Sequence, residues 1–434
     1  MYRHSDADAD FAAVFRRGRL TPLAAVILVY SIAFAVAVAV SAVVTRIARD
    51  VAHRYDHLDR PDDRKKHSRA VPRVGGVGIA TGTAAGLVAL IVGAHVEHVP
   101  LPLAGLLPVV VGASVVFALG LWDDLVKVSF RVRLAVQVVV AWAMTLAGWH
   151  IDLSNVPFVE LLGAFEQAAI SVPLTVLWTV GLINALNLLD GLDALAGGTA
   201  LIGFTALAVA FAPVADPVLL AVCVIGAAGT AGFLVYNRHP ASVFMGDGGS
   251  TLLGFLLAMA AVRGVSAMPT AGLVVLPVVA LGLPILDTLT TMARRIADGY
   301  SPFLPDADHL HHRAYARSGN VRVAVRKLHL TAVVFGALAV GLRVAMGTEV
   351  VQVLILVVTA VFAYAVVRRL GYVRTRDVMR AVVKSLGYLR ARRLARQALS
   401  ADAAAPPAGS PARPTSGDGY SGHTPRLEPE PDTA

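Results

Sequence analysis

Long apolar runs alternate with short polar loops along most of this chain. The first run, 22–45, exceeds the roughly 20 apolar residues that a helix needs to cross a hydrocarbon core. Ten more runs follow it, at 74–94, 101–121, 133–150, 171–188, 194–212, 217–236, 249–263, 271–293, 328–346 and 349–367. The pattern predicts an all-α polytopic membrane protein, a bundle of about 11 transmembrane helices.

The same pattern divides the chain into four parts. Residues 1–20 form a short polar stub, and 21–368 form the transmembrane unit, whose first helix is too long for a cleaved signal sequence. Residues 369–399 are rich in Arg, which indicates either a helix on anionic headgroups or a solvated basic helix that anchors the topology. Residues 400–434 are rich in Pro, Ala, Gly and Ser and are predicted to be disordered. Any catalytic activity must therefore reside in the membrane unit.

Composition supports the membrane assignment. Hydrophobic residues make up 56% of the chain and charged residues only 15%, whereas charged residues alone are about 25% of a soluble protein. The single cysteine, Cys223, lies inside an apolar run, which excludes a disulfide framework and a cysteine-rich metal site. The net charge of +9 is attributed to topology and anionic lipid, because no aromatic residues are interleaved on a basic face. No nucleic-acid partner is expected.

Most Lys and Arg residues lie in odd-numbered loops, after the first, third, seventh and ninth runs. The opposite loops hold few cations, with Arg263 and Arg343 near the ends of their runs. The positive-inside rule therefore predicts that the odd-numbered loops and the C-terminus are cytoplasmic and that the N-terminus is outside. Arg16, Arg17 and Arg19 argue weakly for the reverse orientation.

Nearly all reactive-looking residues lie in five of these polar loops, at 60–67, 123–127, 184–193, 244–249 and 305–312. A transporter usually hides its charges at the bilayer midplane. The concentration at one surface instead indicates chemistry on a water-soluble substrate beside the lipid. A transporter or lipid flippase without chemistry is the alternative from another class.

Two adjacent carboxylates, Asp123 and Asp124, end the third run. A charge at a helix centre costs roughly 2.5–3.5 kcal/mol, so both belong at or beyond the membrane interface. If the helix continues, Asp123 and Lys127 form an i, i+4 pair on one face. An interfacial stop would need only one acid and one Lys, whereas a second acid adds repulsion unless a cation or polyphosphate is nearby. The pair therefore favours a functional site.

Four polar residues follow at three-residue steps in the third of these loops, and Gly191 offers a helix break among them. A helix that ends near Asp190 would let the amides and carboxylates converge on one ligand, and amides are suited to reading a base or sugar edge. Capping of the next helix can explain Asp193 but not the whole set. The set is Asn184, Asn187, Asp190 and Asp193.

Asp247 lies in a glycine-rich segment that opens the eighth run. Glycine allows close backbone approach, and a helix N-terminus favours anions. A carboxylate there is a plausible ligand for Mg²⁺, which takes one or two carboxylates plus phosphate oxygens. The alternative for the segment is a helix cap with a glycine turn.

Histidines and lysines complete the candidate set. His309, His311 and His312 suit phosphate binding or positioning of a leaving group better than zinc, because adjacent histidines cannot readily both point inward. A solvated loop is the alternative. In the first loop, Lys65, Lys66 and His67 suit a phosphorylated lipid or a nucleotide diphosphate, although they also satisfy the positive-inside rule. Three glycines at four-residue spacing indicate close helix packing, namely Gly78, Gly82 and Gly86.

The ordered motifs DRPDDRKKH…PRVGG, DDLVK, NALNLLDGLDALAGG, FMGDGGS and PDADHLHHR resemble the polyprenyl-phosphate N-acetylhexosamine-1-phosphate transferase family, over about residues 50–315. The resemblance implies an 11-helix bundle in a bacterial cell membrane with a cytoplasmic active site. It further implies transfer of a sugar-1-phosphate from a UDP-sugar to a polyprenyl phosphate, release of UMP and a requirement for Mg²⁺, with Mn²⁺ left open. The resemblance does not decide whether the protein forms a homodimer.

The resemblance assigns roles motif by motif. It places Asp123, Asp124 and the three histidines in catalysis and Asp247 and Asp190 at the metal. Substrate binding falls to the remaining candidates, which are Lys65, Lys66, His67, Lys127, Asn184, Asn187, Asp190 and Asp193. Ala194 departs from the family, which often has Gly at this position.

Two branches of the family compete. The branch that makes the first peptidoglycan lipid intermediate from a muramoyl-pentapeptide nucleotide typically has PTMGG and three consecutive histidines. This chain has PRVGG at 72–76 and HLHHR at 309–313. It therefore resembles the WecA- and TagO-type branch, which uses UDP-N-acetylglucosamine to start cell-envelope polysaccharides.

Overall fold

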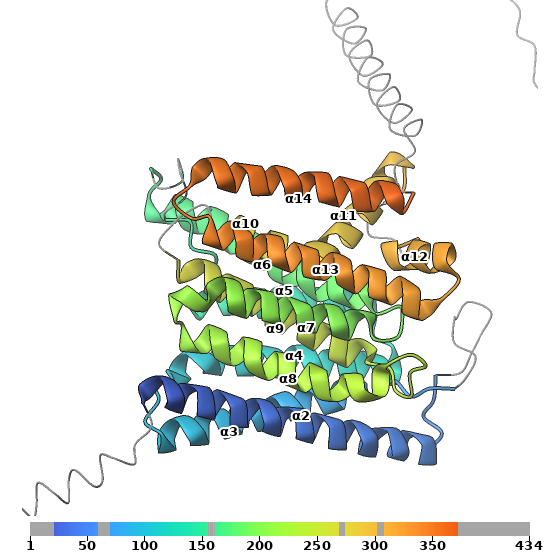
Figure 1. The fold of residues 1–434 in the computed structure, drawn as a ribbon. Helices are drawn as coiled ribbons and strands as arrows, with labels where there is room; N and C mark the ends of the chain where they lie inside the picture. Colours follow the sequence, from blue (N-terminus) through green and yellow to red (C-terminus); the bar gives the residue numbers. More distant parts are fainter. Residues whose placement is uncertain are drawn as a thin grey trace, which may run out of the picture. The chain divides into compact units, whose positions relative to one another are not determined.

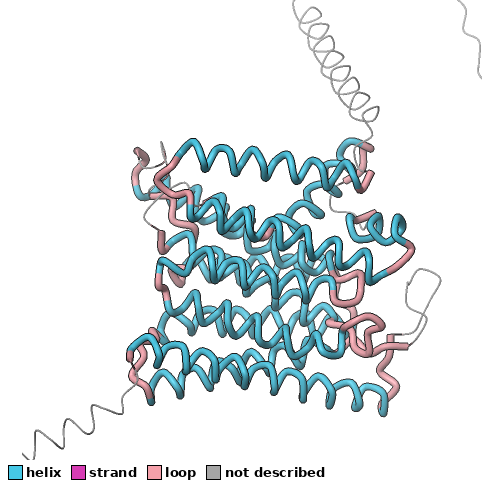
Figure 2. Tube along the Cα trace, in the orientation of Figure 1, coloured by secondary structure: helices cyan, strands magenta, loops and turns pink. Residues whose placement is uncertain are grey.

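The computed structural model describes residues 21–59, 70–154, 156, 159, 161–268, 274–301 and 308–371. Over these residues the fold is helical, apart from an isolated bridge between Asp59 and Val71. The long helices run side by side, with loops at their ends (Figures 1 and 2). The helices are α2 (Pro22–Arg54), α3 (Gly75–Val96), α4 (Leu103–Val126), α5 (Phe130–Leu146), α6 (Ala164–Leu189), α7 (Leu195–Phe211), the 3-10 turn η1 (Ala212–Val214), α8 (Pro217–Asn237), α9 (Gly246–Ser266), α10 (Val275–Ala280), α11 (Gly282–Ala297), α12 (Leu310–Ser318), α13 (Val321–Val344) and α14 (Glu349–Arg369).

The predicted all-α polytopic membrane fold is confirmed. Within the described ranges, 9 helices are long and apolar enough to cross a membrane. The fourth predicted span is the shorter α5, with 17 residues. The ninth is broken at Leu281 into α10 and α11. Pro284 lies in the first turn of α11 and has no N–H to continue the hydrogen bonding of α10, which explains the break.

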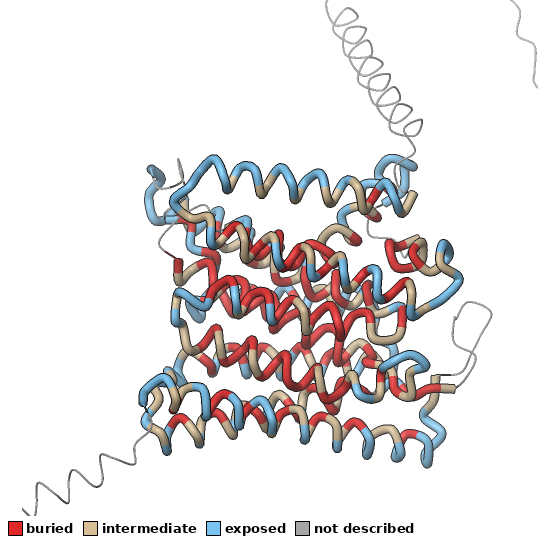
Figure 3. Tube along the Cα trace, in the orientation of Figure 1, coloured by how far each residue is buried: buried red, intermediate tan, exposed pale blue. Residues whose placement is uncertain are grey.

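Helix α9 forms the centre of the bundle and packs against α3, α4, α6, α7 and α8. Almost all of its residues are buried, in the interior of the bundle that Figure 3 colours red, whereas α14 is largely exposed. A helix that is apolar all round and surrounded by others is rigidly placed. The residues at the N-terminus of α9 therefore have fixed positions in the fold.

Small residues bring α2 and α3 into close contact, as predicted. A Cβ atom on Gly78 would overlap with Thr45 Oγ1, and one on Gly86 would lie 2.7 Å from Ala37 Cβ. Glycines at this spacing let two backbones approach in a membrane, where packing rather than water drives association. This contact positions the start of α3, which belongs to the site described below.

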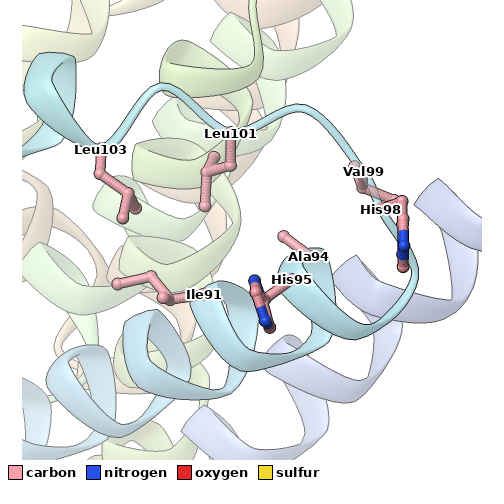
Figure 4. Close-up of a pocket in the computed structure, with 7 residues that line it drawn as sticks. All are labelled: Ile91, Ala94, His95, His98, Val99, Leu101 and Leu103. Carbon is pink, nitrogen blue, oxygen red and sulfur yellow. The ribbon is translucent and has the colours of Figure 1, made fainter.

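The motif-bearing ends of the helices meet at one end of the bundle. There α3, α9 and α12 begin and α4, α6 and α11 end. At the opposite end of α3, about 25 Å away at 1.5 Å per residue, lies a pocket of ≈ 530 Å³ (Figure 4). None of the five motifs contributes to this pocket, which is lined by Ile91, Ala94, His95, His98, Val99, Leu101 and Leu103.

Arg263, one of the few cations of the opposite loops, is neutralised within the fold. Its Nη2 atom lies 2.8 Å from Asp216 Oδ2, and Asp216 Oδ1 accepts a hydrogen bond from Leu219 N at the start of α8. Because Arg263 is paired locally, it does not weigh against the orientation expected from the charge distribution.

Candidate active site

The first-loop glycine motif pairs directly with the segment that leads into α9. Phe244 N donates to Pro72 O at 2.8 Å, Gly75 N to Phe244 O at 2.9 Å, and Gly76 N to Met245 O at 2.8 Å. No Cβ fits on Gly76, because it would overlap with the backbone of α9. These bonds join two motifs that are about 170 positions apart in the chain.

Asp124 of α4 caps the N-terminus of α9. Its Oδ1 accepts from Asp247 N and its Oδ2 from Gly248 N, both at 2.9 Å. Gly246 has φ +75, and a Cβ there would lie 2.5 Å from Asp124 Oδ2, so the turn into α9 requires glycine. The segment therefore does begin with a glycine turn, but the capping carboxylate comes from another helix. Each carboxylate oxygen of Asp124 thus accepts one backbone N–H of α9.

Arg133 of α5 bridges the other two carboxylates. Its Nη1 donates to Asp123 Oδ2 and, at 2.6 Å, to Asp247 Oδ2. Arg73 donates to Asp247 Oδ1 at 3.2 Å and its Nε lies 3.8 Å from Asp124 Oδ1. Burial alone would lower the pKa of Arg73, but the carboxylates of Asp247 and Asp124 raise it above its ordinary value. The sequence had indicated only a topological role for both arginines.

Lys127 lies at the edge of this cluster. Helix α4 ends at Val126, and Lys127 is an exposed C-cap with φ +53 whose N–H donates to Asp123 O. The condition for an i, i+4 pair, a continuing helix, is therefore not met. Arg133 takes the place beside the Asp123 carboxylate.

Helix α6 ends at Leu189, as expected, and Asp190 is its C-cap. Loss of solvation raises the pKa of Asp190 to about 7. The negative charges of Asp247, Asp124 and Asp193 act in the same direction, while Arg73 opposes them. Asp190 thus belongs electrostatically to the carboxylate cluster.

The other three residues of that motif face different neighbours. Asn184 Nδ2 donates to Gln137 Oε1 of α5 at 2.7 Å, and Asn187 Nδ2 donates to Ser250 Oγ of α9 at 3.0 Å. Asp193 accepts from His239 Nδ1 at 2.6 Å and from Ala241 N at 3.1 Å. All three therefore link the motif to its surroundings through these bonds.

The capping alternative for Asp193 is wrong. The N-cap of α7 is Ala194, so the helix has no hydrogen bond from its N–H groups to a capping side chain. Ala194 N donates to Asn237 Oδ1 at 2.8 Å instead. Asp193 serves the α8–α9 connection because its carboxylate faces that loop rather than α7.

The histidine motif opens α12, with His309 as the N-cap. His309 and His311 are buried, and the ring centroids of His311 and His312 lie 4.1 Å apart. His311 lies against Gly191, where any Cβ would overlap with its Nε2. The histidines are thereby brought to the loop that carries Asp190 and Asp193.

Asp287 of α11 was not among the sequence candidates. It is 1% exposed and contacts the start of the histidine motif. The signal that could have found it is a carboxylate inside a predicted membrane span, which is energetically costly and usually functional.

Some predicted residues lie outside the described part of the chain. They are the stub 1–20, Lys65, Lys66, His67, most of the Arg-rich segment 369–399 and all of 400–434. Their assigned roles stay predictions.

The residues present fit a magnesium ion that shares its coordination with a substrate. Within the described ranges, no three His, Cys, Asp or Glu side chains form a metal cage by themselves. Oxygens of Asp123 and Asp247, from two different helices, nevertheless converge on one cationic nitrogen of Arg133. Two carboxylates plus phosphate oxygens and water are what Mg²⁺ prefers.

These features define a class: a polytopic helical membrane protein with carboxylates, guanidinium groups and imidazoles gathered at one end of the bundle. Comparison with known proteins gives the family. Residues 106–265 match the family described as Glycosyl transferase family 4.

Curated relatives extend the match well beyond these residues. A probable undecaprenyl-phosphate N-acetylglucosaminyl 1-phosphate transferase of Bacillus subtilis is 34% identical over 68% of this chain and 80% of its own length. A decaprenyl-phosphate N-acetylglucosaminephosphotransferase of Mycolicibacterium smegmatis is 30% identical over 67% of this chain and 76% of its own. An undecaprenyl-phosphate alpha-N-acetylglucosaminyl 1-phosphate transferase of Yersinia pestis is 30% identical over 61% of this chain and 71% of its own length. The chain belongs to the glycosyl transferase 4 family of polyprenyl-phosphate N-acetylhexosamine-1-phosphate transferases.

Proposed function

We propose that this protein transfers N-acetylglucosamine-1-phosphate from UDP-N-acetylglucosamine to a polyprenyl phosphate and releases UMP. A new bond forms between a lipid phosphate oxygen and the β-phosphorus of the donor. The bond between that phosphorus and the oxygen bridging to UMP breaks. The observation that carries the proposal is the convergence of Asp123 and Asp247 on Arg133, which places two carboxylates and a cation at one point.

This arrangement suits phosphoryl transfer because such reactions depend on positioning and on neutralising phosphate charge. Arg133 and Arg73 are long, forked cations that can exchange a carboxylate for a phosphate without leaving the site. The lipid phosphate is proposed to bind beside Asp123, at the end of α4. The diphosphate of the donor is proposed to lie between Asp247 and His311.

Mg²⁺ is the proposed cofactor, with Mn²⁺ as a substitute to test. Asp247 and Asp123 would hold it, because their oxygens meet at one point. Asp190, which the sequence assigned as the second carboxylate of the metal site, would add to the negative potential there. Bound there, the ion would offset charge on the diphosphate. Asp124 would act indirectly, by holding the N-terminus of α9 that carries Asp247, since both its oxygens accept backbone N–H groups of α9.

The motif-bearing end is proposed to face the cytoplasm of a bacterial cell, where UDP-sugars are found. Gly371, just after α14, contacts Arg313 of α12 through its carbonyl at 2.6 Å, so the last described residues lie at the motif-bearing end. The product would then be a lipid-linked sugar that starts a cell-envelope polysaccharide. The names of the relatives favour N-acetylglucosamine over a muramoyl-pentapeptide donor.

The test is reconstitution of purified protein in bilayers with radiolabelled donor, polyprenyl phosphate and Mg²⁺. We expect a lipid-linked radiolabelled product and stoichiometric UMP from UDP-N-acetylglucosamine. The matched control is Asp247→Asn, which should form no product. Product from the muramoyl-pentapeptide nucleotide alone would overturn the donor assignment. No product with any UDP-sugar would overturn the enzyme and leave transport as the hypothesis.

A further inference from the structure

Asp287 lies where an ionisable residue is costly. It belongs to α11, inside the ninth predicted apolar run, and its side chain is 1% exposed. Buried carboxylates persist only where specific partners compensate for lost hydration. The partners of Asp287 therefore indicate why the residue is there.

Three neighbours of this carboxylate lie at the start of α12. Oδ1 accepts from Leu310 N at 2.7 Å. Oδ2 lies 3.4 Å from His309 Nδ1 and 3.7 Å from His311 Nδ1. One side chain thus accepts from the first N–H of the helix and places its second oxygen beside two imidazoles of the histidine motif.

The two imidazoles are also held by their surroundings. The rings of His309 and His311 are nearly parallel, with 13° between their planes. Thr291, one helical turn after Asp287, places its Oγ1 3.4 Å from His309 Nδ1. On its other side, His311 packs against Gly191. The α11 contacts therefore fix the direction in which His311 meets the α6–α7 loop.

We propose that Asp287 is a positioning residue for the reaction. It anchors the N-terminus of α12 and orients His309 and His311, so that His311 is held against the loop of Asp190. The proposal rests on the proposed function, because it assumes that the histidine motif serves phosphate transfer.

Asp287→Asn tests the proposal because it keeps the shape and one acceptor for Leu310 N but removes the charge that faces the imidazoles. The matched control is Asp298→Asn, an exposed acid at the end of α11. We expect the turnover number of Asp287→Asn to fall on the order of 100-fold, the cost of misplacing a reacting group by about 1 Å. The control should match the unmodified protein.

A second measurement does not depend on activity. Mass spectrometry after treatment with diethyl pyrocarbonate reports how readily each histidine is modified. We expect faster modification of His309 and His311 in Asp287→Asn, and no change at His53, which lies on α2. Unchanged reactivity together with unchanged turnover would overturn the proposal.

A charge-preserving variant guards against a folding defect. If Asp287→Asn does not stay folded, Asp287→Glu decides, because its extra methylene group pushes the carboxylate toward the rings. A folded Glu variant with the unmodified protein's turnover would overturn the positioning role. If the unmodified protein makes no lipid-linked product, the proposed function fails, while the histidine reactivity still reports on Asp287.

Discussion

Asp124 accepts a hydrogen bond from the backbone N–H of Asp247 at 2.9 Å, although the two residues lie 123 positions apart in the chain. A second bond, from Gly248 N, completes the cap. The two acids consequently have different tasks. Asp124 sets where α9 begins, and that beginning decides where the Asp247 side chain projects.

Replacing each acid by its amide should separate these tasks. Asp124→Asn leaves one buried N–H of α9 without an acceptor, so we expect a loss of stability of about 1–3 kcal/mol as well as loss of turnover. Asp247→Asn should abolish turnover without such a loss, because its backbone bond to Asp124 is retained. Thermal unfolding of both purified variants, alongside the product assay, measures the difference. Equal stability of the two variants would contradict the capping role.

Arg133 occupies the point between Asp123 and Asp247 where a divalent cation would bind. We expect Arg133→Ala to bind Mn²⁺ more tightly in the absence of substrate, because the competing guanidinium is gone. Turnover should nevertheless fall about 10- to 150-fold, the equivalent of one charge-assisted hydrogen bond to phosphate. Mn²⁺ binding followed by electron paramagnetic resonance checks the first expectation.

Arg131→Ala is the control for this variant, since Arg131 is an exposed cation on the same helix. It should change neither quantity. Weaker Mn²⁺ binding by Arg133→Ala would show that the arginine supports the metal site instead of competing for it.

Gly191 gives a steric test of the contact between the α6–α7 loop and the histidine motif. A methyl group at this position overlaps with His311, so Gly191→Ala should displace the imidazole and reduce turnover on the order of 100-fold. Gly181→Ala is the matched control, because a Cβ on Gly181 meets nothing within 4 Å. The product assay compares the two. Full activity in Gly191→Ala would mean that His311 does not need its place against the loop.

Hydrophobic periodicity predicted the number and order of the helices well, because a membrane demands long apolar runs. It could not show that the ninth run is two helices, since α10 and α11 are equally apolar near Leu281. Pro284 was the local signal of that break. The sequence also did not show that α4 ends at Val126, one residue before Lys127. The continuing helix that the Asp123–Lys127 pair requires is therefore absent at this position.

The site was predicted as a set of motifs but not as a set of contacts. Arg133 and Arg73 read as topology residues because positive charge in a loop already has that explanation. Their partner Asp247 is 114 and 174 positions away, respectively. Spacing along a chain carries no information about such pairs. Asp287 was missed because a single acid in a long apolar run hardly changes its mean hydropathy.

Ala194 shows what the departure from the family's common glycine means physically. Its φ is +64, in the left-handed region that costs a residue with a Cβ about 1–2 kcal/mol. Ala194→Gly should therefore stabilise the protein by about 1 kcal/mol, because the relief of strain exceeds the added entropy of the unfolded chain. Thermal unfolding in detergent measures the shift, with turnover unchanged, since the N–H of residue 194 still reaches Asn237 Oδ1. The control is Ala200→Gly inside α7, which should change the free energy of unfolding in the opposite direction and destabilise the protein by about 1 kcal/mol. A loss of stability in Ala194→Gly equal to that in Ala200→Gly would contradict the left-handed conformation at Ala194.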